Sequence, residues 1–225
     1  MSRPRQPARV GFRIGDVFDP RDPVARFLTG AAMSTNDLIR IQRYVVAGRS
    51  DDDGVLLFLL RLNAAFVWET ALFVKESRAI PAVDAFINGL PEGARRHLAR
   101  AMDGVLNPGQ TDFGRDLAFI RNHVLHYPEL DEARPDRIAR ALEAVADKDG
   151  AISGVIVEEF RFDFADTVAE RLISRTGRFV LEELAGTVAE FPARTGAFRD
   201  FVDLAFRAYL DDPERRKAIR VTDAR

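Results

Sequence analysis

The sequence contains no cysteine and no apolar run long enough to cross a membrane. Without cysteine the chain has no disulfide framework, thiolate zinc site, iron–sulfur cluster or cysteine nucleophile. The longest apolar run near its middle, 55–60, is followed by Arg61 and Asn63, well short of the roughly 20 residues that span a bilayer. The arginine-rich first residues also lack the apolar stretch of a signal peptide. We therefore expect a cytoplasmic protein without a membrane segment.

An excess of charge of one sign is also missing. The chain has 33 basic and 35 acidic residues, so its composition does not indicate the strongly cationic surface of many nucleic-acid binders. A local basic groove remains open, because all cations except three lysines are arginines, which bind phosphate well. A genomic bias toward arginine codons would give the same excess. With three histidines and no dense cluster of histidine and carboxylate, we predict no metal site and no cofactor.

Hydrophobic spacing predicts that the chain folds almost entirely into α-helices. Apolar residues recur at helical spacing over 23–48 and 54–79, with Pro23 in the first turn of the first helix and the acidic segment 50–54 before the second. Because a short turn joins these two long helices, they should pack antiparallel. Shorter helices are expected over 82–88, 92–105 and 135–147.

One further helix matters most for function. It should begin at a cap formed by Thr111 or Asp112 and end near His126, because Pro128 restricts the residue before it. Its apolar positions follow one face of the helix: Phe113, Leu117, Ile120 and Val124. This stripe should face the core.

The two ends of the chain differ from the middle. Residues 1–22 are predicted to form an N-terminal arm, extended over 10–14. Residues 23–148 form the main helical domain, and 149–225 form a C-terminal helical extension packed on it. In this extension, near-alternating apolar residues over 153–164 predict a short β-hairpin, one extended stretch or the start of a helix. Helices should follow over 166–176, 178–190 and 195–210, with breaks at Gly177 and Pro192.

The chemically suggestive residues are Arg121, Asn122 and His126, which lie off the buried stripe. Asn122 and His126 are four residues apart and share a helix face, and the long side chain of Arg121 can reach them. The helix C-terminus favours a protonated imidazole, so His126 can exchange a proton near neutrality. Because RNA supplies its own 2′-hydroxyl nucleophile, a histidine and an arginine suffice in kind for cleavage without metal.

At these residues the sequence resembles the HEPN (higher eukaryote and prokaryote nucleotide-binding) superfamily, whose motif is an arginine, commonly a following polar residue, and a histidine four to six residues after the arginine. The resemblance covers 23–148 and implies an all-α, up-and-down helical bundle of HEPN type. It further implies catalytic roles for Arg121, Asn122 and His126, RNA as substrate, and a homodimer that pairs two motifs. Such an endoribonuclease would act as a toxin or antiviral defence effector, with a regulatory or antitoxin protein as a further partner.

The same residues also fit a protein without catalytic activity. Arg121 and Asn122 can belong to a solvated helix face, and His126 can cap free carbonyl groups at the helix end. His97 stands in a cationic stretch of a predicted surface helix, which can contact phosphate or simply be solvated. The alternative function is therefore a noncatalytic helical module that binds RNA, a nucleotide or a protein partner.

Overall fold

The computed structural model describes residues 9–47, 53–120, 143–144, 185–217 and 220–222. Its elements are β1 (Arg9–Gly11), α1 (Ile14–Val17), α2 (Pro23–Ala47), α3 (Asp53–Ser77), α4 (Pro81–Gly89), α5 (Glu92–Met102), α6 (Asp112–Ile120), α10 (Ala185–Leu210), α11 (Pro213–Lys217) and β2 (Arg220–Thr222). The predicted all-α class is confirmed, and β1 and β2 form one short two-stranded sheet. The segment 153–164 and the helix expected over 166–176 lie outside the described residues.

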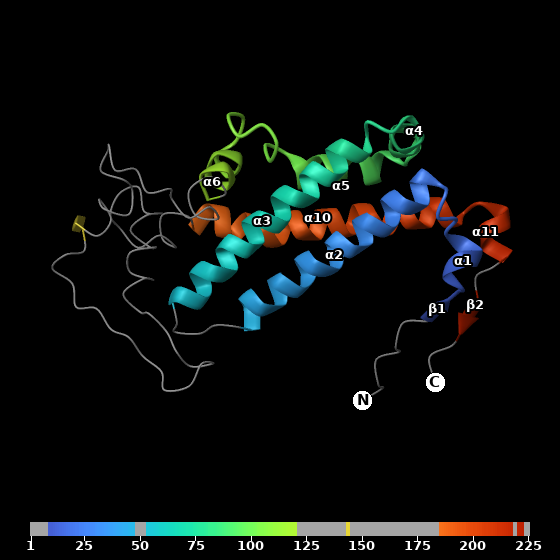
Figure 1. The fold of residues 1–225 in the computed structure, drawn as a ribbon, viewed down its shortest axis with the longest axis horizontal. Helices are drawn as coiled ribbons and strands as arrows, with labels where there is room; N and C mark the ends of the chain where they lie inside the picture. The colour runs from blue at the N-terminus through green and yellow to red at the C-terminus, as the bar shows by residue number, and fades with distance from the viewer. Residues whose placement is uncertain (1–8, 48–52, 121–142, 145–184, 218–219, 223–225) are drawn as a thin grey trace.

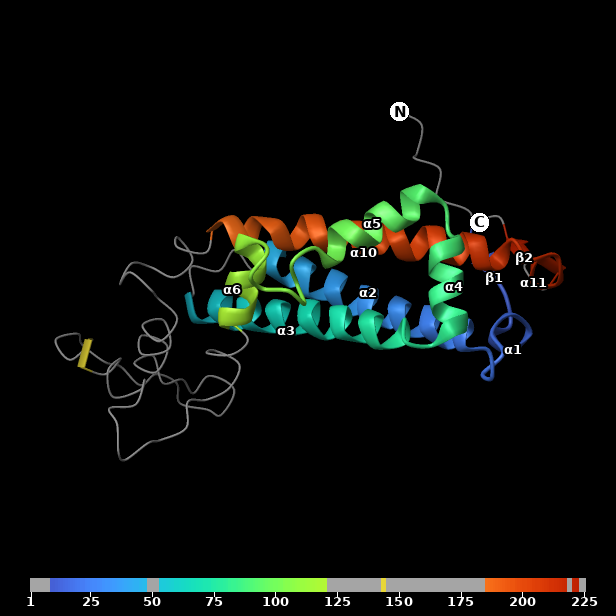
Figure 2. The same cartoon turned by 90° about the horizontal axis from the view of Figure 1, so that it is seen from above.

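The two long antiparallel helices predicted from the sequence are α2 and α3, and their observed ends agree with the prediction to within two residues. They lie side by side and run in opposite directions (Figures 1 and 2). The first begins where the carboxylate of Asp22 accepts a hydrogen bond of 2.8 Å from the backbone N–H of Val24. An aspartate cap followed by Pro23 therefore starts α2.

The prediction that Pro192 breaks the C-terminal helix is wrong, because α10 continues through it from Ala185 to Leu210. Proline removes one backbone donor and crowds the preceding turn, but Pro192 lies on the exposed side of the helix. Arg194 forms an ion pair of 2.9 Å with Glu190, which spans the proline on the same helix. Tertiary packing of the opposite face, which includes buried Phe191, therefore outweighs the local rule.

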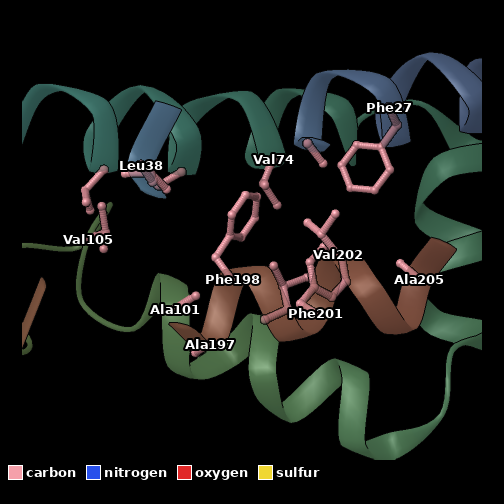
Figure 3. Close-up of a cluster of buried hydrophobic side chains, with 14 of the residues drawn as sticks. Phe27, Leu38, Val74, Ala101, Val105, Ala197, Phe198, Phe201, Val202 and Ala205 are labelled. Atoms are coloured by element: carbon pink, nitrogen blue, oxygen red, sulfur yellow. The ribbon is translucent and has the colours of Figure 1, made fainter. Parts of the chain in front are cut away.

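The core lies where α10 packs against α2, α5 and α6. Figure 3 shows Phe198 and Phe201 extending from α10 toward Val74 and Phe27. The side chains of Phe198 and Phe201 are 1% and 0% exposed, and burying one such ring contributes about 1.5–3 kcal/mol. The small side chains of Ala101 on α5 and Ala197 on α10 are both buried and let these two helices approach closely.

One hydrophobic cluster joins the N-terminal and C-terminal parts of the described chain. It contains residues from Val17 to Tyr209, including buried residues of α2, α3, α5, α6 and α10. Residues 185–210 therefore contribute a central helix to the same core as 23–120. The domain boundary predicted near residue 148 lies outside the described residues.

The two ends of the described chain are held together beside the bundle. β1 pairs antiparallel with β2, with Val10 opposite Val221, whereas Ile14, expected to be extended, begins α1. The hydroxyl of Tyr209 donates a hydrogen bond of 2.9 Å to Asp22, and Arg215 lies 3.6 Å above the Tyr209 ring. Burial and the hydrogen bond to Asp22 raise the pKa of Tyr209 to about 12.

Candidate functional site

The three predicted site residues, Arg121, Asn122 and His126, lie outside the described residues. The structure describes the preceding helix, α6, as far as Ile120, the residue immediately before Arg121. The contacts of α6 with the bundle therefore fix the position of the residue that directly precedes the motif.

The start of α6 is fixed by a side-chain cap and by close backbone packing. Thr111 is the cap, because its Oγ1 accepts a hydrogen bond of 3.0 Å from the backbone N–H of Gly114. This confirms one of the two caps predicted from the sequence. Gly104 adopts a positive φ of 70° in the connection from α5, and a Cβ at Gly114 would overlap the carbonyl oxygen of Gly104. The connection and the helix therefore pack backbone to backbone.

The apolar stripe predicted for this helix is confirmed over its described length. Phe113, Leu117 and Ile120 are all buried, with at most 4% of each residue exposed, and Val124 lies outside the described residues. The Phe113 ring packs edge to face on Phe191 of α10, with a centroid separation of 5.4 Å. One face of α6 therefore points into the core up to the last residue before the motif.

A polar contact also joins α6 to α10. The hydroxyl of Thr187 donates a hydrogen bond to the carboxylate of Asp116. Thr187 lies in the first turn of α10 and is buried. The middle of α6 and the described start of α10 are thus fixed to each other at one end of the bundle (Figure 1).

Arg194 is a buried cation that the sequence interpretation did not single out. Its guanidinium lies 3.8 Å above the Phe113 ring and donates hydrogen bonds of 2.6 Å to the Asp103 carbonyl and 3.4 Å to the Arg100 carbonyl. These carbonyls are at the C-terminal end of α5, where a cation is favoured by the helix dipole. Arg194 therefore ties α5, α6 and α10 together. No local pattern distinguishes it from the many exposed arginines.

The cationic stretch around His97 lies on α5, the surface helix expected from the sequence. His97 is half-buried, whereas its arginine neighbours are exposed: Arg95, Arg96 and Arg100. Arg96 lies 3.7 Å from Glu92, one turn earlier on the helix. The arrangement leaves arginine side chains of α5 open to solvent.

Among the residues that the structure describes, no group of three or more histidine and carboxylate side chains is arranged to hold a metal ion. Within the same ranges, no helix combines the length and the hydropathy that crossing a bilayer requires. Comparison with known protein families, with curated proteins and with solved structures finds no match to this chain.

Proposed function

We propose that the protein is a metal-independent endoribonuclease of HEPN type that uses Arg121, Asn122 and His126. The observation that carries the proposal is the combination of these three residue types directly after α6 in the sequence. The all-α fold agrees with what the resemblance implies, and the Thr111 cap and the buried stripe of α6 agree with the helix predicted from the sequence before the motif.

The proposed reaction needs no nucleophile from the protein. His126 removes the proton of the ribose 2′-hydroxyl as its oxygen bonds to phosphorus, and the bond from phosphorus to the 5′-oxygen breaks. The leaving 5′-oxygen takes a proton from the protonated histidine of the second motif. Arg121 stabilises the charge that develops on the phosphoryl oxygens, and Asn122 orients the phosphate or His126. The products carry a 2′,3′-cyclic phosphate and a 5′-hydroxyl.

A two-fold homodimer is part of this proposal. Each chain supplies a single Arg121 and His126 pair, and a two-fold axis brings the same surface of two subunits together. Two motifs facing each other would provide one histidine as base and one as acid. The proposal also places the enzyme in the cytoplasm as a toxin or antiviral defence effector, restrained by a regulatory or antitoxin protein.

Incubation of purified protein with total RNA in EDTA tests the activity. The wild type should cut RNA, and His126→Ala should lower the rate about 100-fold or more, the usual scale for general acid–base catalysis. His97→Ala is the matched control, because it removes a histidine on α5 outside the motif and should leave the rate unchanged. Equal rates for wild type and His126→Ala would contradict the proposal and favour the noncatalytic helical module that binds RNA, a nucleotide or a protein partner.

A further inference from the structure

A cavity of about 440 Å³ lies between α3, α4 and α5, at the end of the bundle where α4 crosses from α3 to α5 (Figure 2). Its volume is in the range of about 300–1,000 Å³ that is typical of small-molecule sites. Aliphatic side chains form its floor and walls: Ala71, Val74, Ile87, Leu98, Met102 and Leu106. Val74, Ile87 and Leu98 are buried, so the apolar part of the cavity is its deep part.

Cationic side chains form the rim of this cavity. Lys75 comes from the last turn of α3, Arg78 directly follows the end of that helix, and Arg95 comes from the first turn of α5. All three residues are exposed, and no aspartate or glutamate is among the described residues that line the cavity. Lys75 and Arg95 form no ion pair with any part of the chain that the structure describes. Lys75 and Arg95 therefore contribute uncompensated positive charge to the rim, whereas Arg78 is paired with Asp84.

Arg78 is held in a fixed orientation at this rim. Its Nε donates a hydrogen bond of 2.7 Å to Asp84, and its Nη2 donates one of 3.2 Å to the side-chain carbonyl of Asn88. The Asn88 amide nitrogen in turn donates a hydrogen bond of 2.9 Å to Asp84. These contacts use two of the three guanidinium nitrogens, and Nη1 stays available for an anion at the cavity mouth.

The lining distinguishes between classes of anion. A nucleotide base would require a flat surface for stacking and several polar groups for its edges, but the described floor has only apolar side chains and no aromatic ring, and the two guanidinium groups lie at the rim. Asn88 is the one uncharged polar side chain in this lining, and its amide already contacts Arg78 and Asp84. An unbranched hydrocarbon chain needs only apolar contact and fits this floor.

We propose that this cavity binds a free single-chain aliphatic anion, with its hydrocarbon chain on the floor and its carboxylate or phosphate between Lys75, Arg78 and Arg95. The apolar floor supplies affinity and the cationic rim selects a negatively charged head. The site is separate from the Arg121, Asn122 and His126 motif, and the proposal does not depend on ribonuclease activity.

Isothermal titration of the full chain with decanoate, below the concentration at which it forms micelles, tests this site. Decanoate should bind one site per chain. Decan-1-ol, with the same chain but no charge, and acetate, with the charge but no chain, should each bind at least tenfold more weakly. Decyl phosphate should bind as well as decanoate does, because a guanidinium group can donate paired hydrogen bonds to a carboxylate or to a phosphate.

Adjacent arginines on α5 provide a matched pair of variants. Arg95→Ala should weaken decanoate binding about tenfold, which corresponds to about 1.4 kcal/mol, whereas Arg96→Ala should change it less than twofold because Arg96 does not line the cavity. Ala99→Phe should abolish binding by filling the cavity from an exposed lining position. Circular dichroism and thermal unfolding would verify that each variant is folded.

Three results would overturn the proposal: no saturable binding of decanoate or decyl phosphate, equal binding of decan-1-ol, or an equal loss of affinity in Arg95→Ala and Arg96→Ala. Sedimentation with phosphatidylglycerol vesicles distinguishes a free anion from a membrane surface. Binding to the vesicles that depends on Arg95, without binding of monomeric decanoate, would also contradict the proposed site.

Discussion

Replacement of Gly114 by alanine sets two effects against each other in α6. On helix propensity alone, alanine is favoured over glycine in a helix interior by about 1 kcal/mol. In this structure, however, the added Cβ would overlap the carbonyl oxygen of Gly104 and lie 3.0 Å from its carbonyl carbon and 3.1 Å from the Cα of Pro108. All three atoms belong to the backbone, so no side-chain rotation can relieve the contact.

The cost of forcing an extra carbon into a packed site is typically about 1–3 kcal/mol. Because the neighbours of Gly114 are backbone atoms, we take the upper part of this range and subtract the propensity gain. Gly114→Ala should therefore lower the free energy of unfolding by about 1–2 kcal/mol. For a chain of this size, each kcal/mol corresponds to about 2–4 °C in Tm.

Gly196→Ala provides the control. Gly196 also lies inside a helix, α10, but no atom of another described part of the chain is within 4 Å of the Cβ position, so this variant should be more stable by about 0.5–1 kcal/mol. Guanidinium unfolding followed by circular dichroism and by the fluorescence of Trp68, the single tryptophan, measures both changes. If Gly114→Ala is as stable as Gly196→Ala, the result would contradict the close backbone contact between Gly114 of α6 and Gly104 in the preceding connection.

Three further predictions concern other parts of the molecule. Arg194→Met should lower the free energy of unfolding by about 2–4 kcal/mol, because it removes charged hydrogen bonds and leaves carbonyl groups at the end of α5 without a donor; Arg199→Met, on the exposed side of the same helix, should cost less than about 0.5 kcal/mol. Tyr209 should make the folded state less stable as the pH rises from 10 to 12, because its raised pKa of about 12 lets the unfolded chain ionise first. This loss reaches at most about 3 kcal/mol, and denaturant titrations at pH 9 and 11.5 should show a smaller loss in Tyr209→Phe; equal losses in both proteins would contradict it. Arg121→Lys should lower the rate of RNA cleavage at least tenfold, because an ammonium group cannot replace a bidentate guanidinium; an unchanged rate would exclude the proposed role of Arg121.

The helices that could be predicted are those whose signals are local. Apolar spacing and the proline and acidic residues at their starts identified α2 and α3, and Thr111 with the stripe after it identified α6. The predicted break at Pro192 was wrong because the effect of a proline on the local backbone does not include the contacts that hold the helix around it. The Glu190 and Arg194 pair lies within α10 itself, but the aromatic packing of Phe191 depends on Phe113 of α6, which is distant in the sequence.

The two candidate sites also differ in whether their residues lie close together in the sequence. The Arg121, Asn122 and His126 motif is contiguous enough to be recognised in the sequence alone. The cavity could not be predicted, because Lys75 and Arg78 are separated from Arg95 along the chain and become neighbours only where α4 turns the chain back. Its aliphatic floor looks in the sequence like any other buried helix face.

The most direct test of the proposed function uses substrates that differ by one oxygen atom. Mapping the cuts that the protein makes in total RNA gives a preferred sequence, from which two DNA oligonucleotides are made, one with a single ribonucleotide at the cut position and one without. In EDTA, the wild type should cut only the first strand, after the ribonucleotide, leaving a 2′,3′-cyclic phosphate, and His126→Ala should cut it at least about 100-fold more slowly. Equal cleavage of both strands, or cleavage that disappears in EDTA and returns with magnesium, would contradict a reaction in which the RNA 2′-hydroxyl is the nucleophile and His126 transfers the proton.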